Sequence, residues 1–93
     1  MGLRFDWDPD KARRNQRKHG VTFAEAVAIF FDDHGILIHD PDHSNEEDRF
    51  ILIGMSAQLR VLVVNHTYRE DDRLIRLISA RKADALERRQ YGS

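Results

Sequence analysis

The second half of the chain alternates apolar and polar residues in short runs, as β-strands with two different faces do. Glycine, proline, asparagine and clusters of charge separate the runs, as in turns. The pattern predicts four strands, over residues 35–40, 50–56, 60–69 and 74–81. Tight turns join the last three strands, so we expect them to form an antiparallel meander.

The beginning of the chain predicts a short strand followed by a basic helix. Residues 3–7 alternate in character and fit a first strand. Asp8 suits a helix N-cap, Pro9 the first helical position and Gly20 the stop after the last turn. These signals bracket a helix over residues 9–19, whose nearly all-polar interior predicts a surface position.

A second helix is predicted to be apolar. Thr22 and Glu25 have the spacing of a capping box, and Val21 is placed to pack on Ala26. Apolar residues then recur on one stripe as far as Phe31. Residues 82–91 have helical spacing and close the chain. The predicted order is β-α-α-β-β-β-β-α, an α+β fold with a small antiparallel sheet and helices covering one face.

Composition narrows the picture. The 93 residues fit a single domain over residues 1–93, and the absence of cysteine excludes disulfides and thiol chemistry. The net charge of −1 argues against a general nucleic-acid binder. However, residues 1–20 carry six lysines and arginines against three acids, whereas residues 21–48 carry eight acids and neither lysine nor arginine. If the two basic ends of the chain meet, they form a local basic site.

The sequence shows no sign of membrane insertion or export. The first residues, MGLRFDWDPD, carry charges where a signal peptide needs an apolar run. The apolar stretches of the whole chain are far shorter than the roughly 20 residues that span a bilayer. We therefore expect a soluble, cytoplasmic protein without a membrane partner.

The last predicted hairpin carries an unusual number of cations. Alternation places His66 and Tyr68 on one face, and puts Arg81 on the same face as Leu77 and Ser79. A buried apolar face does not accept unpartnered arginines, so at least one must project at a strand end or into a solvated groove. Surface ion pairing with nearby carboxylates is the alternative interpretation of any single arginine.

This combination of side chains suits phosphodiester chemistry. A guanidinium matches phosphate oxygens and stabilises the charge that develops on them. Metal-free RNA cleavage also needs groups that remove a proton from the 2′-hydroxyl and give one to the 5′-oxygen. Candidates for these proton transfers are Lys18, His19, His66 and Tyr68.

Other patterns are weaker. The loop HDPDH, residues 39–43, contains histidines and aspartates, but no second ligand pair supports a metal site. A solvated turn over residues 39–48 is the default interpretation. Trp7 can stack on a base, although a tryptophan beside a first strand is more often a core residue. Phosphate-binding glycine motifs and serine-nucleophile motifs are absent from the sequence.

Four segments together resemble a known family. They are FDWDPDKARRNQRKHGVTFAEA, HSNEEDRFILIG, VNHTYRE and RLISARKADALERRQY. In order and spacing, they are similar to the successive signature blocks of the BrnT family, the toxins of BrnT/BrnA type II toxin–antitoxin systems. The resemblance implies a RelE-like fold and a metal-independent ribonuclease without cofactors that cleaves RNA and arrests growth. It also implies neutralisation by a BrnA-type antitoxin. The toxin would contact DNA only indirectly, through that antitoxin.

The resemblance also implies site residues. The family's basic and aromatic positions match Lys11, Lys18, His19, Arg49, Tyr68, Arg69, Arg76, Arg81, Lys82 and Arg88. We expect catalytic roles for Lys18, His19, Arg49, Arg69 and Arg81, and RNA contacts from Lys11, His66, Tyr68, Arg76 and Lys82. One departure is the turn Ala57-Gln58-Leu59, where family members commonly have glycine; we expect it to alter the turn and not the site.

Two other functions remain open at this point. A non-catalytic binding module would use the same basic groove to dock an acidic partner or an antitoxin. A metal-dependent nuclease would use the HDPDH loop, and its activity would be lost in EDTA.

Overall fold

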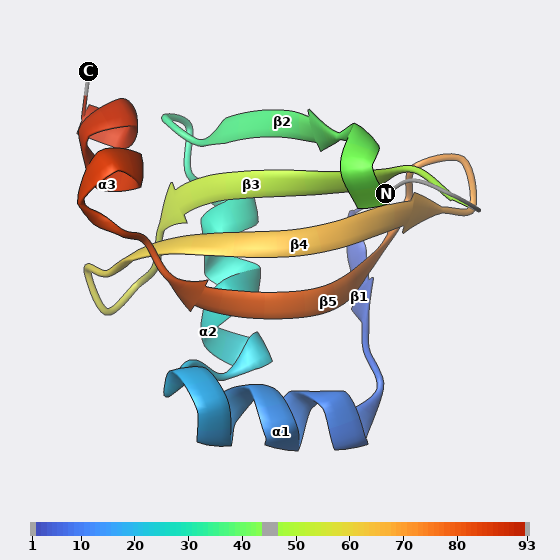
Figure 1. The fold of residues 1–93 in the computed structure, drawn as a ribbon. Helices are drawn as coiled ribbons and strands as arrows, with labels where there is room; N and C mark the ends of the chain where they lie inside the picture. The colour runs from blue at the N-terminus through green and yellow to red at the C-terminus, as the bar shows by residue number, and fades with distance from the viewer. Residues whose placement is uncertain (1, 44–46, 93) are drawn as a thin grey trace.

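The structure, a computed structural model, describes residues 2–43 and 47–92 (Figure 1). Within these ranges one sheet has the strand order β1-β5-β4-β3-β2. Its strands are β1 (Arg4–Asp6), β2 (Ile36–Asp40), β3 (Arg49–Met55), β4 (Val61–Arg69) and β5 (Leu74–Lys82). The α-helices are α1 (Pro9–His19), α2 (Phe23–Val27) and α3 (Ala85–Gly92). Two 3-10 helices that the sequence did not predict are η1 (Ala28–Phe31) and η2 (Pro41–His43). The α+β class is confirmed. The predicted turn over residues 39–48 includes residues 44–46, which lie outside the described ranges.

The sheet is mixed rather than antiparallel. β1 pairs in parallel with β5, with Phe5 opposite Ile75, whereas the other neighbouring strands pair antiparallel. The prediction of an antiparallel sheet is therefore wrong for β1. This strand pairs with a segment from the other end of the chain, so its direction is set by tertiary packing and not by a turn. None of the helices in the described ranges is long and apolar enough to span a bilayer.

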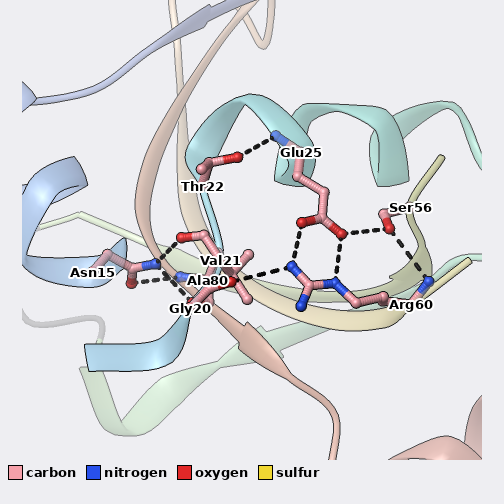
Figure 2. Close-up of polar contacts among 8 residues, drawn as sticks. All are labelled: Asn15, Gly20, Val21, Thr22, Glu25, Ser56, Arg60 and Ala80. Atoms are coloured by element: carbon pink, nitrogen blue, oxygen red, sulfur yellow. Dashed lines mark hydrogen bonds and ion pairs between the residues drawn. The ribbon is translucent and has the colours of Figure 1, made fainter. Parts of the chain in front are cut away.

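The two N-terminal helices begin as their capping residues predict. The Asp8 side chain accepts a hydrogen bond from the Asp10 amide, and Gly20 ends α1 in the left-handed region at φ 68°. Thr22 accepts from the Glu25 amide at 3.0 Å. The predicted helix then changes to 3-10 geometry in η1. In a capping box the Glu25 side chain would turn back toward Thr22. Here its carboxylate accepts hydrogen bonds from the side chains of Ser56 and Arg60 on the β3–β4 turn (Figure 2).

The sheet has two differently covered faces. The first, which we call the helix face, packs α1, α2 and η1 against a cluster of buried side chains from β3, β4 and β5. On the second, the outer face, a smaller cluster of Ile53, Val63 and Ala83 lies against Tyr91 of α3. The Tyr91 hydroxyl donates to Asp32 at 2.5 Å and so ties α3 to the turn before β2. The prediction that all helices cover one face is wrong for α3.

A β-bulge in the last hairpin changes which side chains share a face. His66 pairs with Leu77 and Asn65 with Ser79, so Ile78 has no partner position on β4. Beyond the bulge Arg81 lies opposite Val63, on the outer face. Leu77 belongs to the helix-face core. The prediction that Arg81 and Leu77 share a face is therefore wrong, because one extra residue reverses the alternation.

The buried side chain of Asn15 joins α1 to the edge of β5 (Figure 2). β1 pairs only with residues 74–76, so the edge of β5 beyond them needs another partner. The Asn15 amide nitrogen donates to the carbonyl oxygens of Ala80 at 2.8 Å and Val21 at 3.0 Å, and its oxygen accepts from the Ala80 amide at 3.0 Å. One side chain thus provides the hydrogen bonds of a missing strand.

Replacing Asn15 should therefore cost far more than its small size suggests. Asn15→Ala leaves the Ala80 amide and the Ala80 and Val21 carbonyls without these partners, and we expect a loss of about 3 kcal/mol in the free energy of unfolding. Urea denaturation measures it. Gln16→Ala, at an exposed position of the same helix, should change the value by less than about 0.5 kcal/mol. Equal effects of the two substitutions would contradict this role of Asn15.

Candidate functional site

Four of the predicted site arginines lie on the outer face. Arg49 and Arg76 flank Thr67 in one row across β3, β4 and β5. Arg69 occupies the next outer-face position along β4, and Arg81 lies on the same face further along β5. Three strands thus present guanidinium groups to the side of the sheet away from α1 and α2.

Arg69, Arg76 and Arg81 are each in an ion pair. Arg69 contacts Glu47 at 2.9 Å, and Arg76 contacts Asp6 on the neighbouring β1. Arg81 makes two parallel hydrogen bonds of 2.8 Å to the carboxylate of Glu87 on α3. Surface pairs of this kind contribute little to stability. The guanidinium groups can therefore exchange a carboxylate for a phosphate at small cost.

Glu87, one of the carboxylates that the alternative interpretation pairs with the hairpin arginines, holds Arg81 from a fixed position. The Glu87 carboxylate accepts from the Asp84 amide at 2.9 Å, and the Asp84 carboxylate accepts from the Glu87 amide at 2.8 Å. These reciprocal bonds form a capping box at the start of α3. The hydrogen bonds from Arg81 lower the pKa of Glu87, which favours its ionised form. The D-x-x-E spacing was the available signal in the sequence.

A groove of about 400 Å³ runs between α1 and β5. Its lining residues are Lys11, Arg14, Asn15, Lys18 and His19 from α1, and Ile78 and Ser79 from the bulge in β5. Sequence reasoning selected Lys11, Lys18 and His19 but missed Arg14, which lies three residues after Lys11 and four before Lys18. It also missed Ser79, because the bulge that turns it toward the groove depends on strand pairing.

The groove and the outer-face arginines meet at β5. Arg76 and Arg81 stand on either side of Ile78 and Ser79 along this strand. Figure 1 shows α1 running alongside β5 at the lower border of the sheet. The structure thus places the α1 cations beside β5, the strand that carries Arg76 and Arg81, with Arg69 on the adjacent β4 and Arg49 one strand further, on β3.

Lys82 does not join this group. It lies opposite Leu62, which belongs to the helix-face core. Its charge lowers the pKa of Glu25, after the larger effect of the hydrogen bond from Arg60. Lys82 therefore sits nearer the Glu25 network than the outer-face arginines, and its predicted RNA contact does not fit this position. Arg88 donates to the Ala83 carbonyl at 2.8 Å, at the base of α3.

His66 is completely buried, so the prediction that it contacts RNA does not fit the structure. Its ring packs edge-on against Phe30, with the centroids 4.8 Å apart. Its Nδ1 lies 3.1 Å from the Val64 carbonyl, and its Nε2 lies 3.2 Å from the Tyr68 hydroxyl. Burial lowers the pKa of His66 from 6.5 to about 4. The neutral ring is a core side chain that positions Tyr68.

Tyr68 is also separated from the arginines. It lies on the helix face, where it lines a second pocket with Leu37, Asp48, Phe50 and Asp72. Burial, and then the charge of Asp72, raise the pKa of Tyr68 above 10.0. An acidic pocket repels phosphate, so the predicted RNA contact of Tyr68 does not fit this location either.

Potential metal ligands do not cluster in residues 2–43 and 47–92, where no group of three or more histidine, cysteine, aspartate or glutamate side chains could hold an ion. In the HDPDH loop, His39 faces Asp48 at 3.2 Å. The first two residues of the predicted turn, 39 and 40, end β2, and Pro41–His43 then form the 3-10 helix η2.

Comparison with known proteins decides the family. Residues 7–87 match the family model described as "Ribonuclease toxin, BrnT, of type II toxin-antitoxin system". The chain belongs to the BrnT family. A solved structure, the ribonuclease toxin BrnT of Brucella abortus at 1.1 Å resolution, is 25% identical, with a TM-score of 0.66 over 88% of this chain and 97% of the other. No curated protein matches the chain.

Membership in the BrnT family carries two consequences. The family consists of ribonuclease toxins, and a type II system implies an antitoxin protein as partner. The basic groove beside β5 is the surface of this BrnT chain that suits a polyanion. The acidic pocket beside Tyr68 has the opposite electrostatic character.

The burial of His66 predicts a pH-dependent stability. The unfolded chain binds a proton at His66 below pH 6.5, whereas the folded chain does so only below about pH 4. Stability should therefore fall by about 3 kcal/mol as pH decreases across this window, and stay constant above it as far as this group is concerned.

Urea denaturation of the parent and of His66→Gln between pH 7 and pH 4 measures this effect. Carboxylates contribute equally to the pH dependence of both proteins, so the difference between them is due to His66. The parent should lose more stability than the variant. Independently of any variant, NMR titration of the His66 ring should show no protonation near pH 6.5. A His66 ring that titrates near 6.5 would contradict its burial as a neutral group.

Proposed function

We propose that this chain is a metal-independent endoribonuclease toxin that binds and cleaves RNA in the groove between α1 and β5. The observation that carries the proposal is the groove that Lys11, Lys18 and His19 line together with β5, the strand that also carries Arg76 and Arg81. A groove lined by cations from one helix and one strand can follow the phosphate backbone of a single strand. Cleavage would arrest growth, and a BrnA-type antitoxin would neutralise it.

In this mechanism the arginines hold the reacting phosphate. Arg76 and Arg81 lie on β5 before and after the groove residues Ile78 and Ser79. Each guanidinium can donate two parallel hydrogen bonds to phosphate oxygens. As the 2′-oxygen attacks phosphorus, charge develops on the nonbridging oxygens, and fixed donors stabilise it. Arg49 and Arg69 would contact neighbouring phosphates on the outer face. Until RNA displaces them, Glu87 pairs with Arg81 and Asp6 pairs with Arg76.

Two residues at the end of α1 carry out the proton transfers. Lys18 and His19 are adjacent in sequence, and both line the groove. One removes the proton from the 2′-hydroxyl and the other supplies a proton to the departing 5′-oxygen, which leaves a 2′,3′-cyclic phosphate on the RNA. When water opens this cyclic phosphate, the two proton transfers run in reverse and both groups return to their starting protonation states. In this mechanism protein side chains stabilise the developing charge and transfer the protons, so the proposal needs no metal ion.

The remaining parts of the proposal concern the protein as a whole. Residues 1–93 form a single toxin domain with a RelE-like fold, and it acts in the cytoplasm. It contacts DNA only through its antitoxin. The alternative function is a non-catalytic binding module, and the cleavage assay distinguishes it from a ribonuclease.

The direct test is cleavage of a single-stranded RNA by purified, antitoxin-free protein in EDTA. Arg81→Ala should lower the cleavage rate about 10²–10³-fold, the usual effect of removing one donor to a transition-state oxyanion. Circular dichroism checks that the variant is folded. Arg73→Ala, in the exposed β4–β5 turn, is the matched control and should cleave like the parent.

Three results would contradict parts of the proposal. Loss of the parent's activity in EDTA would indicate a metal-dependent nuclease. Equal cleavage by the parent and a folded Arg81→Ala variant would place the site elsewhere. RNA binding without cleavage, with and without ribosomes, would indicate a binding module.

The groove itself predicts the salt dependence of RNA affinity. Lys18→Gln removes one cation from the groove, so the slope of log affinity against log salt should decrease by about 0.7 for single-stranded RNA. Arg17→Gln changes the neighbouring residue of α1, which does not line the groove. Fluorescence anisotropy of a labelled 2′-O-methyl RNA measures both slopes without cleavage. A larger change in slope for Arg17→Gln would contradict the assignment of the groove.

A further inference from the structure

A pocket of about 480 Å³ opens on the helix face, away from the proposed RNA groove. Its lining residues are Leu37, Asp48, Phe50, Tyr68 and Asp72, which come from β2, β3, β4 and the adjoining turns. Strand register places Leu37, Phe50 and Tyr68 on the face opposite to Arg49 and Arg76. Neither ribonuclease chemistry nor the helix-face core gives this pocket a role.

Its aromatic wall is fixed in position. The rings of Phe50 and Tyr68 meet edge to face, with centroids 5.2 Å apart and an angle of 72°. His66 packs behind them, 5.1 Å from Tyr68, and is itself held by Phe30. Because the Nδ1 of neutral His66 faces a carbonyl, Nδ1 carries the hydrogen. Its Nε2 therefore accepts a hydrogen bond from the Tyr68 hydroxyl. The Tyr68 oxygen is left as an acceptor.

The polar groups of the pocket are all acceptors of hydrogen bonds. Asp48 and Asp72 add two carboxylates to the Tyr68 oxygen, and no lysine or arginine is among the described residues that line the pocket. His39 lies beside it, 3.2 Å from Asp48 and 5.2 Å from the Phe50 ring. The charge of the pocket excludes phosphate and favours a cation with N–H donors, which carboxylates bind and aromatic rings attract.

The neighbourhood of the pocket indicates that this cation belongs to a polypeptide. β2 is the last strand of the sheet, and in the described part of the chain no strand pairs with its outer edge. Leu37 and Ile38 on this strand are 53% and 41% exposed. An extended segment beside β2 would pair with its backbone, cover these side chains and deliver one of its own into the pocket.

We propose that this pocket binds an arginine or lysine side chain of the antitoxin, presented by an extended segment that runs along β2. The inference rests on the type II toxin–antitoxin family and not on RNA cleavage. It places a contact with the antitoxin toward the β2 edge of the sheet, whereas the proposed RNA groove lies beside β5. The antitoxin would then hold the toxin by an electrostatic match that RNA cannot imitate.

NMR titration of the full-length toxin tests the chemistry with a defined probe, acetyl-Val-Arg-Val-amide. Saturable shifts should centre on the rings of Phe50 and Tyr68 and on the amides of β2. The citrulline analogue, which has the same shape without the charge, should bind at least about tenfold more weakly, the effect of losing one charge-assisted contact. Free L-arginine, which lacks the flanking segment, should also bind more weakly.

Variants separate the pocket from the general acidity of this end of the molecule. The double variant Asp48→Asn/Asp72→Asn should lose most of the preference for the arginine peptide. Asp71→Asn is the matched control: it changes a charge in the same turn, at a residue that also has positive φ and does not line the pocket. It should keep that preference.

Equal affinity of the arginine and citrulline peptides, or shifts outside the pocket, would overturn the proposal. Binding of free arginine as tight as that of the peptide would indicate a small-molecule site and overturn the assignment to a protein partner. RNA cleavage by the double variant is measured in parallel and should equal that of the parent. Failure of this proposal is therefore distinguishable from failure of the ribonuclease proposal.

Discussion

The arrangement of the candidate site depends on the hydrogen bonds that Asn15 makes with Ala80 and Val21. α1 is rich in cations and, of its residues, buries Asn15 alone. Apolar packing therefore holds this helix only weakly, and its charges repel one another. A buried amide that replaces the missing strand on β5 fixes both the distance and the direction of the helix. Lys18 and His19 consequently line a groove together with Ile78 and Ser79 of the bulge.

Charge in this protein is distributed unevenly over its surface. The outer face and the α1 groove collect arginines and lysines, whereas the Tyr68 pocket on the helix face collects carboxylates. The arginines are not bare, because Glu47, Asp6 and Glu87 occupy three of them. A nearly neutral molecule can thus bind a polyanion on one surface and a basic segment on another.

Local signals in the sequence predicted local structure well. The caps of α1, the start of α2 and the three-strand meander follow from residues close together in the chain. The pairing of β1, the bulge at Ile78 and the position of α3 depend on contacts between distant segments, so periodicity could not show them. The same limit applies to the site. Alternation correctly put His66 and Tyr68 on one face, but only the fold shows that this face is a buried aromatic core.

The central claim is that RNA lies between α1 and β5. Mapping of amide chemical shifts with a short 2′-O-methyl RNA tests it most directly, because the blocked 2′-oxygen prevents cleavage and leaves the phosphates unchanged. The account predicts the largest shifts at Lys18, His19, Ser79 and Arg81, with Phe50 and Tyr68 unaffected. Shifts that centre on Phe50 and Tyr68, with none along α1, would contradict it.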